Sequence, residues 1–433
     1  MAKENKLIKN AMWIIGCRIV RAVLNVFVTM LTARCFGPSN YGLINYAASV
    51  VAFVAPVMML GLDTTLVQEF VEKPEQKGCT LGTALGMNLL SALACMAGIA
   101  AFVAIANPGE KTTLIVCVLY SLNLPLQVLE MTQYWFQAEL KSKYTSATML
   151  LSYILVSLYK IYLLVTEKGV YWFAVSQAID YFIISVVLLI IYHRIGGQKL
   201  RFSFRRGKEM LSRSRYYIIS SLMITIFAQT DKIMLKMMVG DEAVGYYSAA
   251  VLCAGMTGFV FSAIIDSAKP IVWEARKKSK VLFERNMTML YSVVIFLALA
   301  QSAVITVLAE LVVLMLYGIE YLQSVQVLRI VVWYTTFSYL GAARTVWILG
   351  EEKHDLLWKV NLYGALANVL LNYLLIPTHG AAGAAIASLA TQIFTNFLVG
   401  FMIPALRDTN KLIIRALNPC SLIRGVRELL KKE

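Results

Sequence analysis

The feature that most constrains this chain is a series of apolar segments, each long enough to cross a lipid bilayer. A helix of about 20 residues spans the hydrocarbon core. Only 15% of the residues are charged, against about a quarter in a typical soluble domain. We therefore predict an all-α membrane protein with about twelve transmembrane helices. The predicted spans are 11–35, 42–62, 81–106, 113–137, 146–166, 171–192, 216–239, 246–268, 290–317, 325–349, 359–376 and 381–404.

The distribution of lysine and arginine predicts how these spans are oriented. The net charge is +15, and the basic residues outside the spans gather at both termini and in alternate loops. The remaining loops carry only Lys111 and Lys168. Basic loops stay in the cytoplasm under the positive-inside rule, so we predict that both termini are cytoplasmic. The charge also favours contact with anionic membrane lipids. No recognition motif accompanies it, so it does not indicate nucleic-acid binding.

The residue types that usually carry catalysis or bind metals form no recognisable motif. The seven cysteines are scattered without a metal-ligand spacing, which is typical of small apolar fillers in helices. The three histidines fall in predicted loops or at span ends. The outer loops are too short to hold the catalytic groups of a membrane glycosyltransferase. We therefore expect a protein that is not an enzyme and has no metal or other cofactor.

The two halves of the chain match each other around a basic central segment. Residues 193–215 separate six predicted spans from six. A G-x-x-x-x-G sequence follows the first span at Gly37–Gly42 and the seventh at Gly240–Gly245. A second match places Gly169 and Gly380 before small residues near the end of each half. Six is an even number, so both halves enter from the same side. This predicts parallel repeats about an axis along the membrane normal, with the substrate between them.

These features predict four parts of the chain. An N-terminal six-helix lobe covers 1–192, and a cytoplasmic basic linker covers 193–215. A C-terminal six-helix lobe covers 216–404, and a cytoplasmic tail covers 405–433. Apolar residues near the end of the tail share one helix face, with basic residues elsewhere. This pattern is typical of an amphipathic helix lying on the inner leaflet.

Ionisable and polar residues inside the spans are the candidates for a substrate site. A charge at the membrane centre costs roughly 2.5–3.5 kcal/mol and usually faces a cavity. The basic residues outnumber the acidic ones, which favours an anionic substrate, because guanidinium groups bind phosphate bidentately. The alternatives are snorkelling to the headgroups and helix packing. The candidate cavity residues are Arg18, Arg21, Asn25, Gln127, Glu130, Tyr134, Lys160, Lys232 and Arg344.

Two groups of these candidates each share one helix face. Arg18, Arg21 and Asn25 are spaced by three and four residues in the first span, and so are Gln127, Glu130 and Tyr134 in the fourth. Two guanidinium groups one turn apart are tolerable where water and an anion share the space. Amides and aromatic rings suit sugars, although helix packing and an interfacial aromatic belt explain the fourth span equally well.

Several local sequences carry a family resemblance. They are LTARCFGPSNYG at 31–42, YWFQAE at 134–139, the Asp231-Lys232 pair and NVLLNYLLIPTHGAAGAAI at 368–386. Together they resemble bacterial polysaccharide flippases of the Wzx type, within the multidrug/oligosaccharidyl-lipid/polysaccharide exporter superfamily. Ala138 departs from the pattern, where we expect glycine. The resemblance implies two six-helix lobes in a V with a central cavity.

The resemblance also implies a function. It is the transfer of an undecaprenyl-diphosphate-linked oligosaccharide repeat unit across a bacterial cytoplasmic (inner) membrane for surface polysaccharide biosynthesis, by alternating access. The implied partners are this lipid-linked oligosaccharide, membrane lipids, and a polysaccharide polymerase with its chain-length machinery. Two alternatives in the superfamily stay open: a multidrug antiporter and a lipid-linked peptidoglycan precursor flippase. The chain lacks a nucleotide-binding P-loop, so the energy comes from a gradient of Na⁺ or H⁺, the membrane potential or product removal.

A cation site in the second half is a further hypothesis. Asp231, Asn368, Asn372, Thr391 and Thr395 carry carboxylate, amide and hydroxyl oxygens, which suit a hard cation such as sodium. Related flippases have a sodium site on comparable helices. The alternative is a charge pair between Asp231 and a neighbouring lysine, with amides that pack helices together.

Overall fold

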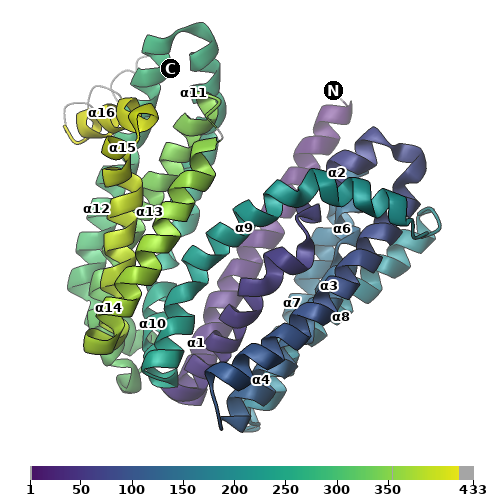
Figure 1. The fold of residues 1–433 in the computed structure, drawn as a ribbon, viewed down its shortest axis with the longest axis horizontal. Coiled ribbons are helices and arrows are strands. Elements are labelled where there is room, and N and C mark those ends of the chain that lie inside the picture. Colours follow the sequence, from purple (N-terminus) through teal and green to yellow (C-terminus); the bar gives the residue numbers. More distant parts are fainter. Residues whose placement is uncertain (1, 354, 419–433) are drawn as a thin grey trace. The chain divides into compact units, whose positions relative to one another are not determined.

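The computed structural model describes residues 2–353 and 355–418, with the side chains of 2–15, 18, 19 and 64 left out. Within that range the chain is almost entirely helical, without a strand (Figure 1). A helix satisfies its backbone hydrogen bonds internally, as a segment in lipid must. The predicted fold class, an all-α membrane protein, is therefore confirmed.

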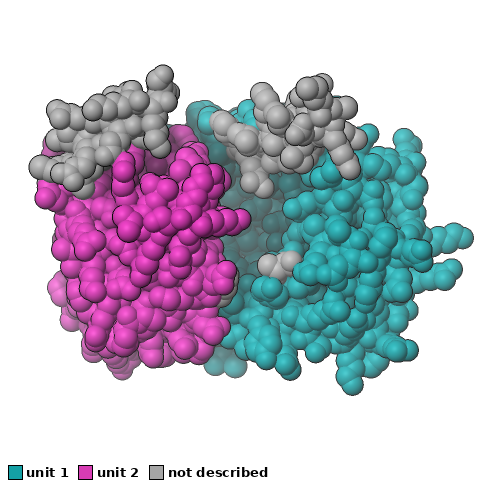
Figure 2. All heavy atoms as spheres, turned by 90° about the horizontal axis from the view of Figure 1, so that it is seen from above, with its two compact units in different colours: residues 1–229 teal, residues 230–433 magenta. Residues whose placement is uncertain are grey.

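The chain forms two compact units, Met1–Gln229 and Thr230–Glu433 (Figure 2). Helix α9 (Phe204–Met238) begins in unit 1 and ends in unit 2. The other helices of unit 1 are α1 (Ala2–Met59), α2 (Leu62–Glu72), α3 (Lys77–Ala106), α4 (Lys111–Ser121), α5 (Asn123–Glu130), α6 (Thr132–Ala138), α7 (Ser142–Val165) and α8 (Val170–Arg194). Those of unit 2 are α10 (Asp241–Gly255), α11 (Gly258–Lys278), α12 (Lys280–Tyr317), α13 (Gln323–Gly350), α14 (Asp355–Ile393), α15 (Val399–Met402) and α16 (Arg407–Ala416).

Fewer helices than predicted spans qualify as membrane-crossing by length and composition. In the described chain there are eight, or nine if α10 and α11, bent by 45°, form one broken span. Part of the difference has a simple cause, because α1 and α14 each run through a kink, at Gly37 and Gly380. Each of these long helices contains two predicted spans. The total of twelve stays a prediction.

The two matching glycines of the predicted repeat both have a positive φ and a ψ near 180°. Gly37 has φ 68° and ψ 175°, and Gly240, before α10, has φ 127° and ψ −176°. A positive φ disfavours residues with a Cβ atom, so glycine lets the chain turn sharply between two spans at both places. The backbone therefore gives the sequence match a common physical basis.

The basic segment 193–215, which we predict to be a cytoplasmic linker, belongs to unit 1 and packs against its helices. Its backbone at 198–203 lies over one face of α3 that is lined by Gly78, Gly82 and Gly86. A Cβ atom on Gly82 would lie 2.6 Å from the carbonyl oxygen of Arg201. Ser203 N donates to Thr83 Oγ1 at 3.0 Å. We call residues 196–215 the strap. The unit boundary accordingly falls inside α9, after Gln229.

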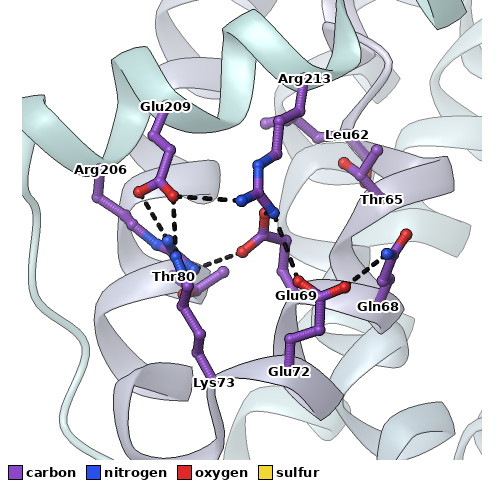
Figure 3. A network of polar contacts seen from close by, with 10 residues as sticks. All are labelled: Leu62, Thr65, Gln68, Glu69, Glu72, Lys73, Thr80, Arg206, Glu209 and Arg213. Atoms are coloured by element: carbon purple, nitrogen blue, oxygen red, sulfur yellow. Dashed lines mark hydrogen bonds and ion pairs between the residues drawn. The ribbon is translucent and has the colours of Figure 1, made fainter.

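An ion-pair cluster fastens the far end of the strap to α2. Arg206 and Arg213 on α9 point toward Glu69, whose carboxylate is 3% exposed (Figure 3). Arg206 lies 2.5 Å from Glu69, and Arg213 lies 3.0 Å from it. Glu209 lies 2.8 Å from Lys73 and 2.9 Å from Arg206. Hydrogen bonds from Lys73 and Arg206 lower the pKa of Glu209 to about 2.

The beginning of the predicted tail is part of unit 2. Leu412 and Ile413 of α16 are buried in the core that α11, α12 and α13 share. Tyr291 and Thr409 hydroxyls lie 2.6 Å apart, and Asn410 Nδ2 donates to Phe397 O at 2.8 Å. Residues up to Ala416 are therefore built into the lobe. The predicted amphipathic helix falls mostly in 419–433, outside the described residues.

Candidate functional sites in the membrane-spanning helices

A buried carboxylate organises the polar residues of unit 1. Asp180 on α8 is 4% exposed, and Ser152 Oγ donates to its Oδ1 at 2.6 Å. Arg21 on α1 approaches its Oδ2 at 3.8 Å. The Arg21 guanidinium also lies 5.1 Å from the ring centre of Tyr153, whose hydroxyl donates to Asn25 Oδ1 at 2.9 Å. Helices α1, α7 and α8 thus hold Arg21 in place.

Two further charges complete this group, which we call the unit 1 cluster (Arg21, Asn25, Glu130, Tyr153, Lys160 and Asp180). Glu130 is 8% exposed and interacts electrostatically with Arg21 and Asp180. Lys160 interacts with the same pair, and its Nζ lies 5.1 Å from the ring centre of Phe173. Two cations and two anions make the cluster nearly neutral. Asp180 is not among the predicted cavity residues, although an acid inside a span is an available signal.

The second buried site lies in unit 2, around the carboxylate of Asp231 on α9, which is 5% exposed. Its Oδ1 accepts hydrogen bonds from Asn368 Nδ2 at 3.1 Å and Asn372 Nδ2 at 2.6 Å. Its Oδ2 accepts hydrogen bonds from Tyr247 OH at 2.5 Å and from Ser388 Oγ. We call these five residues the Asp231 cluster. Four donors compensate for burying the charge, as a buried carboxylate requires.

The structure brings three of the five predicted cation-site residues together. Thr391 Oγ1 donates to Ala387 O at 2.7 Å, and Thr395 Oγ1 donates to Thr391 O at 2.9 Å. Both hydroxyls therefore bond to their own helix, and no bond of either to Asp231 is present among the described residues. Their places at the carboxylate are taken by Tyr247 and Ser388.

The sequence contains a signal for Ser388 at this site but none for Tyr247. Ser388 precedes Thr391 by three residues and lies on the same helix face. The helix spacing therefore makes Ser388 as good a candidate for the site as Thr391. Tyr247 gave no such signal, because its contact depends on how α10 packs against α9 and α14. The competing hypothesis named Lys232 or Lys236 as the charge partner of Asp231. Lys236 lies 2.7 Å from Asp241 instead, whereas Lys232 interacts electrostatically with Asp231.

The remaining predicted cavity residues with described side chains make no hydrogen bond to the carboxylate of Asp180 or Asp231, and Lys232 interacts with Asp231 only electrostatically. Arg344 is 2% exposed, and its Nη1 donates to Thr395 O at 3.1 Å. Gln127, Tyr134 and Lys232 are half-buried on α5, α6 and α9. The side chain of Arg18 lies outside the described residues.

The Asp231 cluster is the place in unit 2 that best suits a cation. Asn372 Oδ1 is buried and has no hydrogen-bond partner among the described residues. A carboxylate beside an amide oxygen of this kind is the ligand chemistry that hard cations prefer. Rotation of the Asn372 amide would turn a second oxygen toward the carboxylate.

The fold and its long apolar helices are those of a multi-pass membrane protein. The chain matches the model of the polysaccharide biosynthesis protein family over residues 7–275, and it belongs to that family. It is 20% identical over 395 residues to the capsular polysaccharide biosynthesis protein CapF of Staphylococcus aureus, covering 89% of this chain and 96% of the relative.

Two solved structures with a similar fold are a flippase and a transporter. The lipid II flippase MurJ, in an inward closed conformation, matches with a TM-score of 0.73 and 14% identity, over 94% of this chain and 91% of MurJ. An inward-facing multidrug resistance MATE family transporter of the MOP superfamily matches with a TM-score of 0.68 and 15% identity, over 90% of this chain and 96% of that chain.

Proposed function

We propose that the protein transfers an undecaprenyl-diphosphate-linked oligosaccharide repeat unit across the bacterial cytoplasmic membrane, for surface polysaccharide biosynthesis. The observation that carries the proposal is the match to the polysaccharide biosynthesis family over residues 7–275. The fold, which this chain shares with a lipid flippase and a multidrug transporter, supports transport by alternating access. The orientation proposed from the basic loops places both termini in the cytoplasm. A polysaccharide polymerase and its chain-length machinery are the proposed protein partners.

Arg21 is the proposed diphosphate ligand in this mechanism. Its side chain is 40% exposed, and its distance of 3.8 Å from Asp180 exceeds hydrogen-bond length. The pair therefore holds the guanidinium in place without using up its N–H donors. Charge-assisted bonds from such donors to phosphate are among the strongest that a side chain makes. Arg18, three residues earlier on the same helix, is the proposed second ligand.

The Asp231 cluster is the proposed site of ion coupling. Its buried carboxylate and the unpartnered amide oxygen of Asn372 would bind Na⁺, or the carboxylate would bind H⁺. Either cation would neutralise the charge and loosen the donors that surround it. A change in how α9, α10 and α14 pack would follow, because all three helices contribute residues to the cluster.

A multidrug antiporter is the second candidate, and the unit 1 cluster is the observation that favours it. Glu130 and Asp180 are buried carboxylates of the kind that could bind a cationic drug or exchange a proton. Arg21 and Lys160 oppose this assignment, because they already balance both negative charges.

The test is complementation of a strain that lacks the gene, with variants expressed at equal levels. Arg21→Ala should lose most of the surface polysaccharide, and Arg21→Lys should recover only part, since lysine keeps the charge but loses the planar fork. Thr166, exposed at the end of α7, supplies the control Thr166→Ala, which should export normally. Normal export by Arg21→Ala would remove the phosphate site from the proposal.

A further inference from the structure

A pocket of about 320 Å³ that is lined by both polar and apolar side chains opens beside Arg21. It lies entirely within unit 1, between α1, α6 and the first turns of α7, and we call it the α7 pocket. Pockets that bind small ligands have volumes of roughly 300–1,000 Å³, so this one suits a single small polar group. Its polar lining consists of Arg21, Gln133, Gln137, Ser142, Thr145 and Ser146.

Thr145 is the residue that indicates a missing ligand. It is 7% exposed, and its hydroxyl has no hydrogen-bond partner in the described part of the chain. A buried hydroxyl without a partner is unfavourable, and native proteins rarely leave one so. The Thr145 side chain lines the pocket, so a ligand there could supply the partner.

The start of α7 provides a second set of donors near the pocket. The helix is 24 residues long, and its N-cap, Lys141, makes no capping bond from its side chain. The first N–H groups of a helix have no partner within the helix, and its N-terminus carries a partial positive charge. Ser142 and Thr145 of this first turn both line the pocket. The site therefore has hydroxyl, amide and guanidinium groups, and its lining contains no carboxylate.

We infer that the α7 pocket binds the sugar attached directly to the diphosphate, while Arg21 at its wall binds the phosphate. The inference rests on the proposed function. Amide and hydroxyl groups both donate and accept hydrogen bonds, which matches sugar hydroxyls, whereas phosphate oxygens only accept. The volume suits one sugar ring, so the other sugars of the repeat unit lie outside the pocket.

The pocket then contributes to substrate specificity. A site built around a buried hydroxyl strongly rejects a substrate analogue that leaves this hydroxyl without a hydrogen bond. An apolar site rejects an analogue with an extra group much less strongly. Thr145 should therefore discriminate by the hydroxyl pattern of the first sugar. Gln133 and Gln137 lie one turn apart on α6. Gln137 should contribute less than Thr145, because its side chain is exposed and can bond to water instead.

The experiment compares two lipids on the purified full-length protein in lipid nanodiscs. One is the lipid-linked repeat unit purified from the strain that lacks the gene, and the other is undecaprenyl diphosphate. We expect the parent protein to bind the sugar-bearing lipid about tenfold more tightly, the effect of one or two hydrogen bonds. Thr145→Val should bind the two lipids alike, and Thr145→Ser, which keeps the hydroxyl, should restore the difference.

The control is Thr148→Val, because Thr148 is similarly buried, at 6%, on the same helix but outside the pocket lining. It should keep the parent's tenfold preference. If Thr145→Val folds and keeps that preference too, the pocket does not hold the sugar, although Arg21→Ala would still weaken both lipids and leave the proposed function intact. If the parent protein binds neither lipid, the proposed function itself fails.

Discussion

Removal of the Glu69 carboxylate should destabilise the protein through the strap. Glu69 is 3% exposed and Arg206 is 6% exposed, so Glu69→Ala leaves a buried guanidinium without its nearest counter-charge. Breaking a buried ion pair by removing one partner typically costs about 3–5 kcal/mol. Glu209 still lies 2.9 Å from Arg206 and compensates in part. We therefore expect a loss near the lower end, about 3 kcal/mol.

The neighbouring carboxylate supplies a matched control. Glu209 is 41% exposed and water screens its ion pairs, so Glu209→Ala should cost only about 0.5–1 kcal/mol. The double variant Glu69→Leu with Arg206→Met should return to within about 1 kcal/mol of the parent, because a buried pair can be replaced by apolar side chains with little loss.

Unfolding of the detergent-solubilised variants by a denaturing detergent measures these differences. The parent, Glu69→Leu, Arg206→Met and the double variant form a double-mutant cycle, which isolates the coupling between the two residues. Equal losses for Glu69→Ala and Glu209→Ala would refute the argument from burial. So would a double variant as unstable as the sum of the single ones.

The remaining predictions test the orientation, the ion site and the strap. In a cysteine-free protein in intact cells, an impermeant thiol reagent should label Lys111→Cys and leave Lys277→Cys unlabelled; the reverse would overturn the proposed orientation. Asp231→Asn should abolish the dependence of transport on sodium or pH, and a parent protein insensitive to both would remove the coupling site. Gly82→Leu should lower stability by about 1–3 kcal/mol, as overpacking does, and expose the strap to protease. Gly98→Leu, where a Cβ meets open space, should do neither.

The sequence predicted best where a single helix carries the signal. Asn368 and Asn372 are one turn apart and therefore share a face, and Asp231 is an acid inside a span. These two facts, together with the resemblance to flippases that have a sodium site on comparable helices, led us to expect the three residues at one site. Tyr247 could not be found in this way, because its hydroxyl reaches Asp231 only through the packing of α10, which no local pattern specifies.

The strap shows that charge composition alone does not predict which residues form ion pairs. Its basic residues indicated a cytoplasmic linker, and two of the acids that pair with them, Glu69 and Glu72, lie more than 100 residues earlier, on α2. The spacing of Gly78, Gly82 and Gly86 was the available signal. Small residues at every fourth position let another backbone approach closely. Here they accommodate an extended segment, whereas in membrane proteins such a stripe commonly accommodates a second helix.

The basic residues in the spans differ in how far their charge is balanced by neighbouring groups. Lys236 is paired with Asp241, so its positive charge is largely balanced, and Arg344 is 2% exposed with a hydrogen bond to a backbone carbonyl, so its guanidinium does not face an open surface. Arg21 differs because Asp180 holds it at 3.8 Å while its side chain stays 40% exposed. A carboxylate so close also weakens the attraction of Arg21 for an anion. For a transporter this is an advantage, because a substrate must be bound and then released. An unopposed arginine beside a diphosphate would favour the bound state alone.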